Sequence, residues 1–159
     1  MQLGLFEEVA DALRGLVPVE LGDLRARARR YGIKVWFGAV TPPREHYEAQ
    51  VIGPRHVEGA TVLGLEVGFH AEHQRPAEND AVIAHLLHEE GRWREALGGE
   101  ATAGLFLGGA DGWRRISEAW PDPDLGDADL GFEVAARLVD YVTALEVIRR
   151  GRLSGEGRR

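Results

Sequence analysis

Two segments near the middle of the chain place histidine and glutamate in the alternating pattern of a β-strand. They are "HYEAQVI", residues 46–52, and "LGLEVGFHAEH", residues 63–73. Successive side chains of a strand point to opposite faces, so each segment would have one apolar side and one polar side. The polar sides together carry two histidines, two glutamates, one glutamine and two glycines: His46, Glu48, Gln50, Gly64, Glu66, Gly68 and His70.

This set of side chains suits two kinds of chemistry. Two imidazoles and two carboxylates can hold a divalent ion such as Zn²⁺ or Mn²⁺, which makes His46, Glu48, Glu66 and His70 candidate metal ligands. Alternatively, two close carboxylates drive their pKa values apart, so that Glu48 and Glu66 become candidate catalytic groups, one as acid and one as base. The enzyme hypothesis is therefore a small metal-assisted hydrolase, with the imidazoles as ligands and one glutamate as the base.

The same surface could instead bind a ligand without catalysing a reaction. Gly64 and Gly68 would leave a shallow floor where a ligand approaches the backbone, and Trp36 is expected beside it. Together with Gln50, these are the candidate ligand-binding residues. We take as the leading hypothesis a non-enzymatic module without a cofactor, which binds a small ligand, a protein or a second copy through an open polar sheet face. An ordinary solvated face is the third alternative.

The polar patch forms only if the two segments pair as a hairpin across the loop at 53–59, where opposed side chains lie about 5 Å apart. Hydrophobic periodicity and the positions of glycine and proline predict the surrounding elements. In chain order these are helices over 3–16 and 20–31, strands over 33–40, 46–52 and 60–70, a helix over 76–97, a strand over 101–109 and a helix over 129–150. The segment 113–120 fits a fifth strand and a short helix equally well.

Helices at both ends of the chain, with another between runs of strands, indicate an α+β domain. We expect an antiparallel sheet of four to five strands with the N-terminal, central and C-terminal helices packed on one face. The chain has 159 residues, 44% of them hydrophobic, which is enough for one core,. Residues 1–152 are therefore predicted to form a single domain, followed by a mobile polar tail at 153–159.

The charge balance is acidic, with 26 Asp and Glu against 19 Lys and Arg and a net charge of −7. An acidic surface repels phosphate backbones, which argues against nucleic acid as a partner. The one dense basic run is "RARARR", residues 25–30. On the predicted helix its charges would spread around the axis, as on a solvated face; a phosphate or RNA contact is the alternative.

The chain contains no cysteine, which excludes disulfides, zinc–thiolate sites and thiol chemistry,. Its first residues, "MQLGLFEEVADALRGL", lack the basic flank and unbroken apolar run of a signal peptide. No later stretch approaches 18 consecutive apolar residues. We therefore expect a soluble cytoplasmic protein without a membrane contact. The preference for arginine over lysine indicates a bacterial, GC-rich genome.

Overall fold

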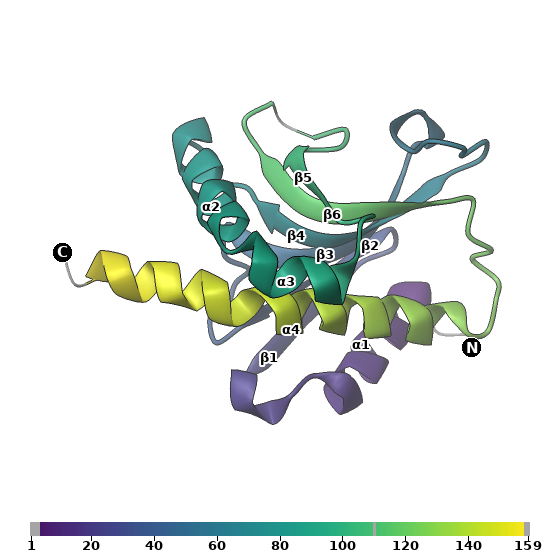
Figure 1. The fold of residues 1–159 in the computed structure, drawn as a ribbon. Coiled ribbons are helices and arrows are strands. Elements are labelled where there is room, and N and C mark those ends of the chain that lie inside the picture. The colour runs from purple at the N-terminus through teal and green to yellow at the C-terminus, as the bar shows by residue number, and fades with distance from the viewer. Residues whose placement is uncertain (1–3, 110, 158–159) are drawn as a thin grey trace.

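The computed structural model describes residues 4–109 and 111–157 of the chain. These residues form an α+β fold with four α-helices and one antiparallel sheet of six strands (Figure 1). The expected fold class is confirmed, with slightly more strands than predicted. The strands run across the sheet in the order β1-β2-β3-β4-β6-β5. Their bounds are β1 Leu24–Ala28, β2 Gly32–Phe37, β3 Glu45–Ile52, β4 Gly64–Ala71, β5 Thr102–Leu105 and β6 Arg114–Pro121.

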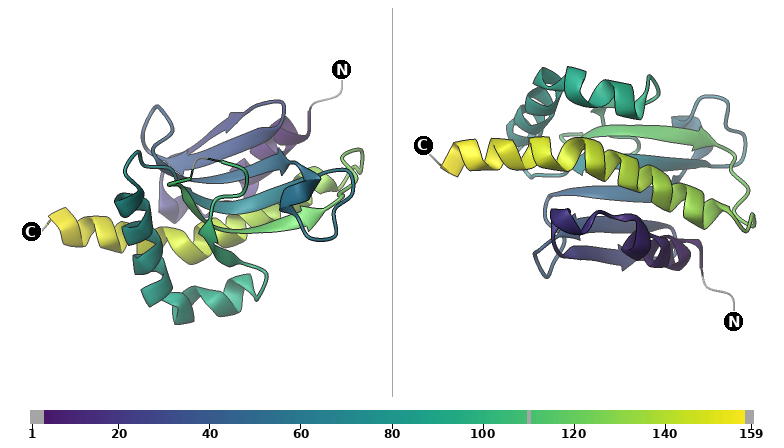
Figure 2. Two further views of the ribbon diagram at one scale, coloured as in Figure 1. Left: turned by 90° about the horizontal axis from the view of Figure 1, so that it is seen from above. Right: turned by 60° about the horizontal axis from the view of Figure 1, so that its bottom comes forward.

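The α-helices pack against one face of this sheet, and the longest of them crosses the strands (Figure 2). Their bounds are α1 Leu5–Leu16, α2 Pro76–His88, α3 Glu90–Leu97 and α4 Leu130–Gly157. Burial of apolar side chains between the two layers provides the main stabilisation. Leu65, Val67 and Phe69 of β4 are fully buried in this core, as their alternation predicts. The opposite face of β4 is thereby left to its polar residues.

Most of the segment predicted as a second helix, 20–31, is instead the edge strand β1 followed by a tight turn; only its first residues are helical, in the short 3₁₀ helix η1, Val19–Leu21. Arginine, alanine and leucine all favour helices, but this segment also alternates. Leu24 and Ala28 are half-buried, whereas Arg25 and Arg27 are exposed. Pairing along β2 satisfies the backbone of this segment, and this tertiary contact outweighs the local helix preference. The two arginines consequently share one face of the sheet.

The central helix is divided into α2 and α3 at Glu89, although the sequence predicts one continuous helix. Glu89 has φ −101° and ψ 18°, outside regular helical geometry,. The buried indole of Trp93 donates its N–H to the carbonyl oxygen of Leu86, at 2.7 Å. The same carbonyl accepts the N–H of Glu89, at 3.1 Å, so two donors close the end of α2 and one of them ties the buried Trp93 of α3 to it.

The ambiguous segment 113–120 corresponds to strand β6, which lies between β4 and β5. At the other end of the chain, α4 continues through 153–157, within the segment for which the sequence predicts a mobile tail; residues 158–159 lie outside the described part. Among the described residues, no helix combines the length and apolar character needed to cross a membrane.

Asp122, directly after β6, anchors the loop between β3 and β4. Its carboxylate accepts hydrogen bonds from the backbone N–H groups of Val62, Thr61 and Leu63, at 2.7–3.1 Å. These bonds lower the pKa of Asp122 to about 2. Its φ of 44° lies in the left-handed region, which aspartate and asparagine tolerate better than most other residues.

Candidate metal centre

The hairpin of β3 and β4 places the polar residues of both strands opposite one another, on the face away from the helices. In its register His46 pairs with His70, Glu48 with Gly68, and Gln50 with Glu66. The hairpin predicted from the alternation is therefore present. The backbone ladder also extends one residue past β4, because the N–H of Glu72 donates to the carbonyl of Arg44, at 2.8 Å. This bond keeps Glu72 in the same alternation as His70.

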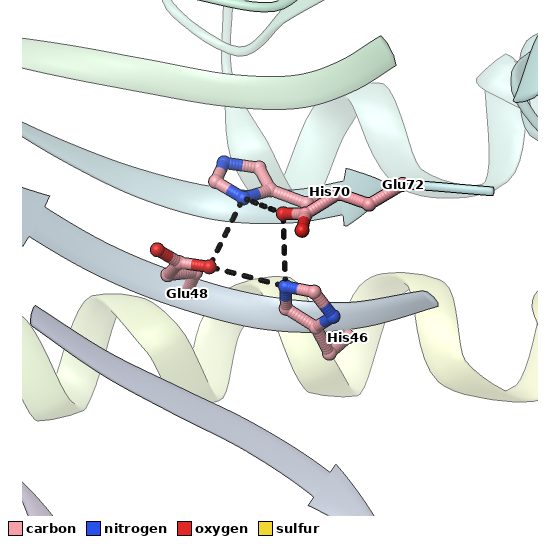
Figure 3. Close-up of side chains that lie close together, drawn as sticks. All are labelled: His46, Glu48, His70 and Glu72. Carbon is pink, nitrogen blue, oxygen red and sulfur yellow. Dashed lines mark hydrogen bonds and ion pairs between the residues drawn. The ribbon is translucent and has the colours of Figure 1, made fainter. Parts of the chain in front are cut away.

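Four side chains of this hairpin converge on one point, two imidazoles and two carboxylates in alternation (Figure 3). His46 Nε2 lies 3.0 Å from Glu48 Oε1 and 3.1 Å from Glu72 Oε2. His70 Nδ1 lies 3.4 Å from Glu48 Oε1 and 3.2 Å from Glu72 Oε2. The four potential ligand atoms are all within 4.8 Å of one another. We call these four residues, His46, Glu48, His70 and Glu72, the His/Glu cluster.

These spacings fit the ligand shell of a small divalent ion. Zinc bonds to nitrogen and oxygen ligands are about 2.0–2.2 Å long, which places neighbouring ligand atoms about 3–3.5 Å apart. The two nitrogens and two oxygens also suit Mn²⁺ and other first-row divalent ions. An ion of this class would be held by one atom from each residue of the His/Glu cluster.

The far nitrogen of each histidine is already engaged by the protein. His46 Nδ1 is 2.9 Å from the carbonyl oxygen of Pro43, which can only accept a hydrogen bond, so Nδ1 carries the proton,. His70 Nε2 is 3.1 Å from Glu66 Oε2. Both imidazoles thus direct their remaining nitrogen toward the cluster. Metal-binding histidines in proteins show this arrangement, because the outer hydrogen bond fixes the tautomer and the ring orientation.

Glu66 supports His70 from behind and is itself held in place. Its carboxylate accepts hydrogen bonds from Gln50 Nε2 at 2.8 Å and from Ser117 Oγ at 2.7 Å. Ser117 Oγ in turn accepts one from Arg115 Nη1 at 3.0 Å. Glu66 is fully buried, so these contacts compensate for the loss of water around its charge. A chain of hydrogen bonds across β3, β4 and β6 therefore positions one imidazole.

His70 Nδ1 supplies independent evidence for a ligand at the cluster. Among the buried side-chain polar atoms of the described residues, it is the one without a well-directed hydrogen bond. The imidazole of His70 has 0% of its surface exposed. A buried polar atom without such a bond costs free energy, and a metal ion at the cluster would satisfy this one.

The electrostatics of the cluster favour positive charge at its centre. Burial disfavours the ionised form of Glu48, but the hydrogen bond with His46 and the close contact with His70 Nδ1 outweigh it and lower its pKa to about 2. Burial likewise opposes the ionised form of Glu72, and close contacts with the same two imidazoles lower its pKa. Conversely, burial favours neutral His70, while the charge of Glu66 and contacts with the other glutamates raise its pKa well above 6.5. Glu48 and Glu72 thus remain ionised. Their charges pair either with protonated imidazoles or with a bound cation.

The loop between β5 and β6 covers part of this face, which the sequence predicts to be open. The ring of Phe106 packs edge-on against His70, with 4.4 Å between centroids, and Trp113 packs against Phe106 in turn. A cleft of about 400 Å³ remains beside the cluster, and Glu48 and Glu72 line it together with residues 106–109 and Trp113. The carboxylate side of the cluster is therefore accessible to a small molecule, whereas His70 is enclosed.

Of the predicted metal ligands, the structure brings three into the cluster, His46, Glu48 and His70, and places Glu66 behind His70. The fourth cluster member is Glu72, which the sequence reasoning did not include. Its signal was the continued alternation 66, 68, 70, 72 in the same quoted segment. The predicted strand ends at 70 and therefore excludes Glu72.

The predicted ligand-binding residues lie on the same face but differ in their surroundings. Gln50 lines the cleft. Trp36 is buried, and its indole N–H donates to the carbonyl of Ala39 at 2.7 Å. The space above Gly64 is filled by the side chain of Val57, and the space above Gly68 by the backbone of β6. The two glycines thus permit close packing within the protein.

Comparison of the chain with protein-family models, with curated proteins and with solved structures finds no match.

Proposed function

We propose that this protein binds a divalent transition-metal ion through His46, Glu48, His70 and Glu72, and that the ion assists hydrolysis of a small molecule in the adjoining cleft. The observation that carries this proposal is the convergence of four ligand atoms with neighbour distances of 3.0–3.4 Å. An ion at this point would polarise a bound carbonyl or phosphoryl group and lower the pKa of a bound water.

The cleft supports a catalytic rather than a purely structural ion. Structural zinc sites are closed by four protein ligands, whereas catalytic sites keep a position for water or substrate. Here the two carboxylates border the cleft, so rearrangement of either one would give a small molecule access to the ion. The two histidines, whose rings are fixed by their outer hydrogen bonds, would hold an ion from the buried side.

Isothermal titration calorimetry of the metal-stripped protein with Zn²⁺ and Mn²⁺ tests the metal centre. We expect one ion per chain in the wild type and loss of binding in His46→Gln. The matched control is His88→Gln, because His88 lies on the surface of α2 with 85% of its side chain exposed. Circular dichroism shows whether His46→Gln is folded. Failure of both ions to bind the wild type, or equal binding by the two variants, contradicts the proposal.

A binding role without turnover is the second candidate, because four protein ligands can complete a tetrahedral shell. Cobalt substitution separates the two roles. The absorption of bound Co²⁺ reports its coordination, so addition of azide should change the spectrum if the ion has an accessible position. A spectrum that azide leaves unchanged supports the closed, non-catalytic site.

A further inference from the structure

A second cleft continues from the metal centre toward the edge of the sheet. It has a volume of about 360 Å³ and is bordered by the turn between β1 and β2. The two clefts share four lining residues: Lys34, Glu48, Gln50 and Val51. The two clefts therefore adjoin along these residues. We call them together the groove, which has the His/Glu cluster near one end and arginines of the basic run 25–30 at the other.

The strand register fixes the order of charges along this groove. Arg27 of β1 is directly opposite Lys34 of β2, and Lys34 is directly opposite Glu48 of β3. Neighbouring strands are about 4.8 Å apart, so the backbone at Arg27 lies about 10 Å from that at Glu48. Arg27 and Lys34 thus lie in one row across the sheet with Glu48, one of the proposed metal ligands.

The cations of the groove are available to a bound anion. Lys34, the only lysine of the chain, has its Nζ at 3.7 Å from Glu72 Oε1, longer than a direct hydrogen bond,. Arg27 and Arg29 line the outer part of the groove. Within the part of the chain that the structure describes, no carboxylate forms an ion pair with either arginine. Three positive groups therefore border the groove: Lys34 has one carboxylate neighbour, Glu72, and the described residues supply none to Arg27 or Arg29.

We infer that the groove binds a phosphorylated small molecule, with its phosphate on Arg27, Arg29 and Lys34 and its other end directed toward the metal centre. This inference rests on the proposed function, because it names the class of substrate on which the ion acts. Guanidinium groups match phosphate oxygens with paired hydrogen bonds. A metal ion would offset the charges of Glu48 and Glu72, which otherwise repel an anion at the inner end.

Phenyl phosphate is a suitable probe, because it joins a phosphate to a small apolar body. Its binding is measured by calorimetry on protein loaded with Zn²⁺ and freed of excess ion, and also on metal-stripped protein. We expect Arg27→Gln to weaken binding by about tenfold or more, as expected for loss of a charged hydrogen-bond partner. The matched control is Arg25→Gln. Arg25 lies on the same strand and the same face but outside the residues that line the groove, so its loss should leave binding unchanged.

The outcomes distinguish this inference from the metal proposal. Equal weakening by Arg27→Gln and Arg25→Gln, or no binding of phenyl phosphate, overturns the phosphate site, while Zn²⁺ titration of the same wild-type preparation reports separately on the metal centre. Benzoate that binds as tightly as phenyl phosphate overturns the phosphate assignment. If phenyl phosphate binds in a manner that depends on Arg27 but the protein takes up no metal, the anion site is supported and its link to a metal centre is overturned.

Discussion

Replacement of Glu66 by glutamine tests whether this residue supports a metal ligand or is one itself. A glutamine oxygen at the position of Glu66 Oε2 can still accept hydrogen bonds from His70 and Ser117, whose distances are 3.1 and 2.7 Å. The new amide group would face Gln50, whose own amide can rotate to present its oxygen. Glu66→Gln thus preserves the geometry and removes only the negative charge behind His70.

The expected effect follows from that single difference. Mutation of an outer partner of a metal-binding histidine typically costs about 10–100-fold in metal affinity, which corresponds to about 1.4–2.7 kcal/mol; Glu66→Gln, which keeps the hydrogen bond, should fall at the lower end of this range. Glu72→Gln, in contrast, removes an anionic ligand and should weaken binding by more than that outer-partner range. Titration calorimetry with Zn²⁺ measures both affinities, and Glu95→Gln, on the exposed side of α3, is the control. If Glu66→Gln abolished binding and Glu72→Gln did not, the assignment of these two glutamates would be refuted.

Three further predictions concern stability. At a free Zn²⁺ concentration about 100 times the dissociation constant, the free energy of unfolding of the wild type should rise by about 2.7 kcal/mol, which raises its melting temperature by about 5–10 °C. In the same thermal-unfolding scans, Glu72→Gln should show a much smaller rise and Glu95→Gln the full one. Asp122→Asn should lower the free energy of unfolding at pH 7, because the depressed pKa of about 2 stabilises the fold above about pH 4. That contribution is lost as the pH falls toward 2, so the free energies of unfolding of the wild type and Asp122→Asn, measured by urea titration, should become more alike at low pH. An equal difference between the two proteins at pH 7 and pH 3 contradicts this account. Gly68→Ala should destabilise the protein by about 1–3 kcal/mol, because its methyl group would collide with the backbone of β6, whereas Gly91→Ala in α3, with open space around it, should stabilise it by up to about 1 kcal/mol; equal effects would be inconsistent with the packing.

Local alternation was sufficient to predict the hairpin at the centre of the fold. In β3 and β4 the apolar residues are spaced two apart, and the loop between them leaves His46 opposite either Gly68 or His70. The sequence therefore places both histidines on one face, and the structure pairs them directly. The same rule extended by two residues would have included Glu72.

The parts that the sequence did not predict depend on contacts between distant segments. Arg25 and Arg27 belong to residues that suit a helix as well as a strand, and pairing with β2 decides between the two. The packing of Phe106 on His70 joins positions 36 residues apart in the chain, and no periodicity within either segment indicates it. The face that strand patterns alone predict to be open is consequently covered in part.

The chain has a single lysine, which lies in the groove with 33% of its side chain exposed. The reactivity of this lysine can therefore report whether the groove is occupied by a ligand. An amine-directed acylating reagent has only one side chain to modify. The mass added at Lys34, followed with and without a bound anion, would therefore measure how much of the groove is filled, without any introduced label.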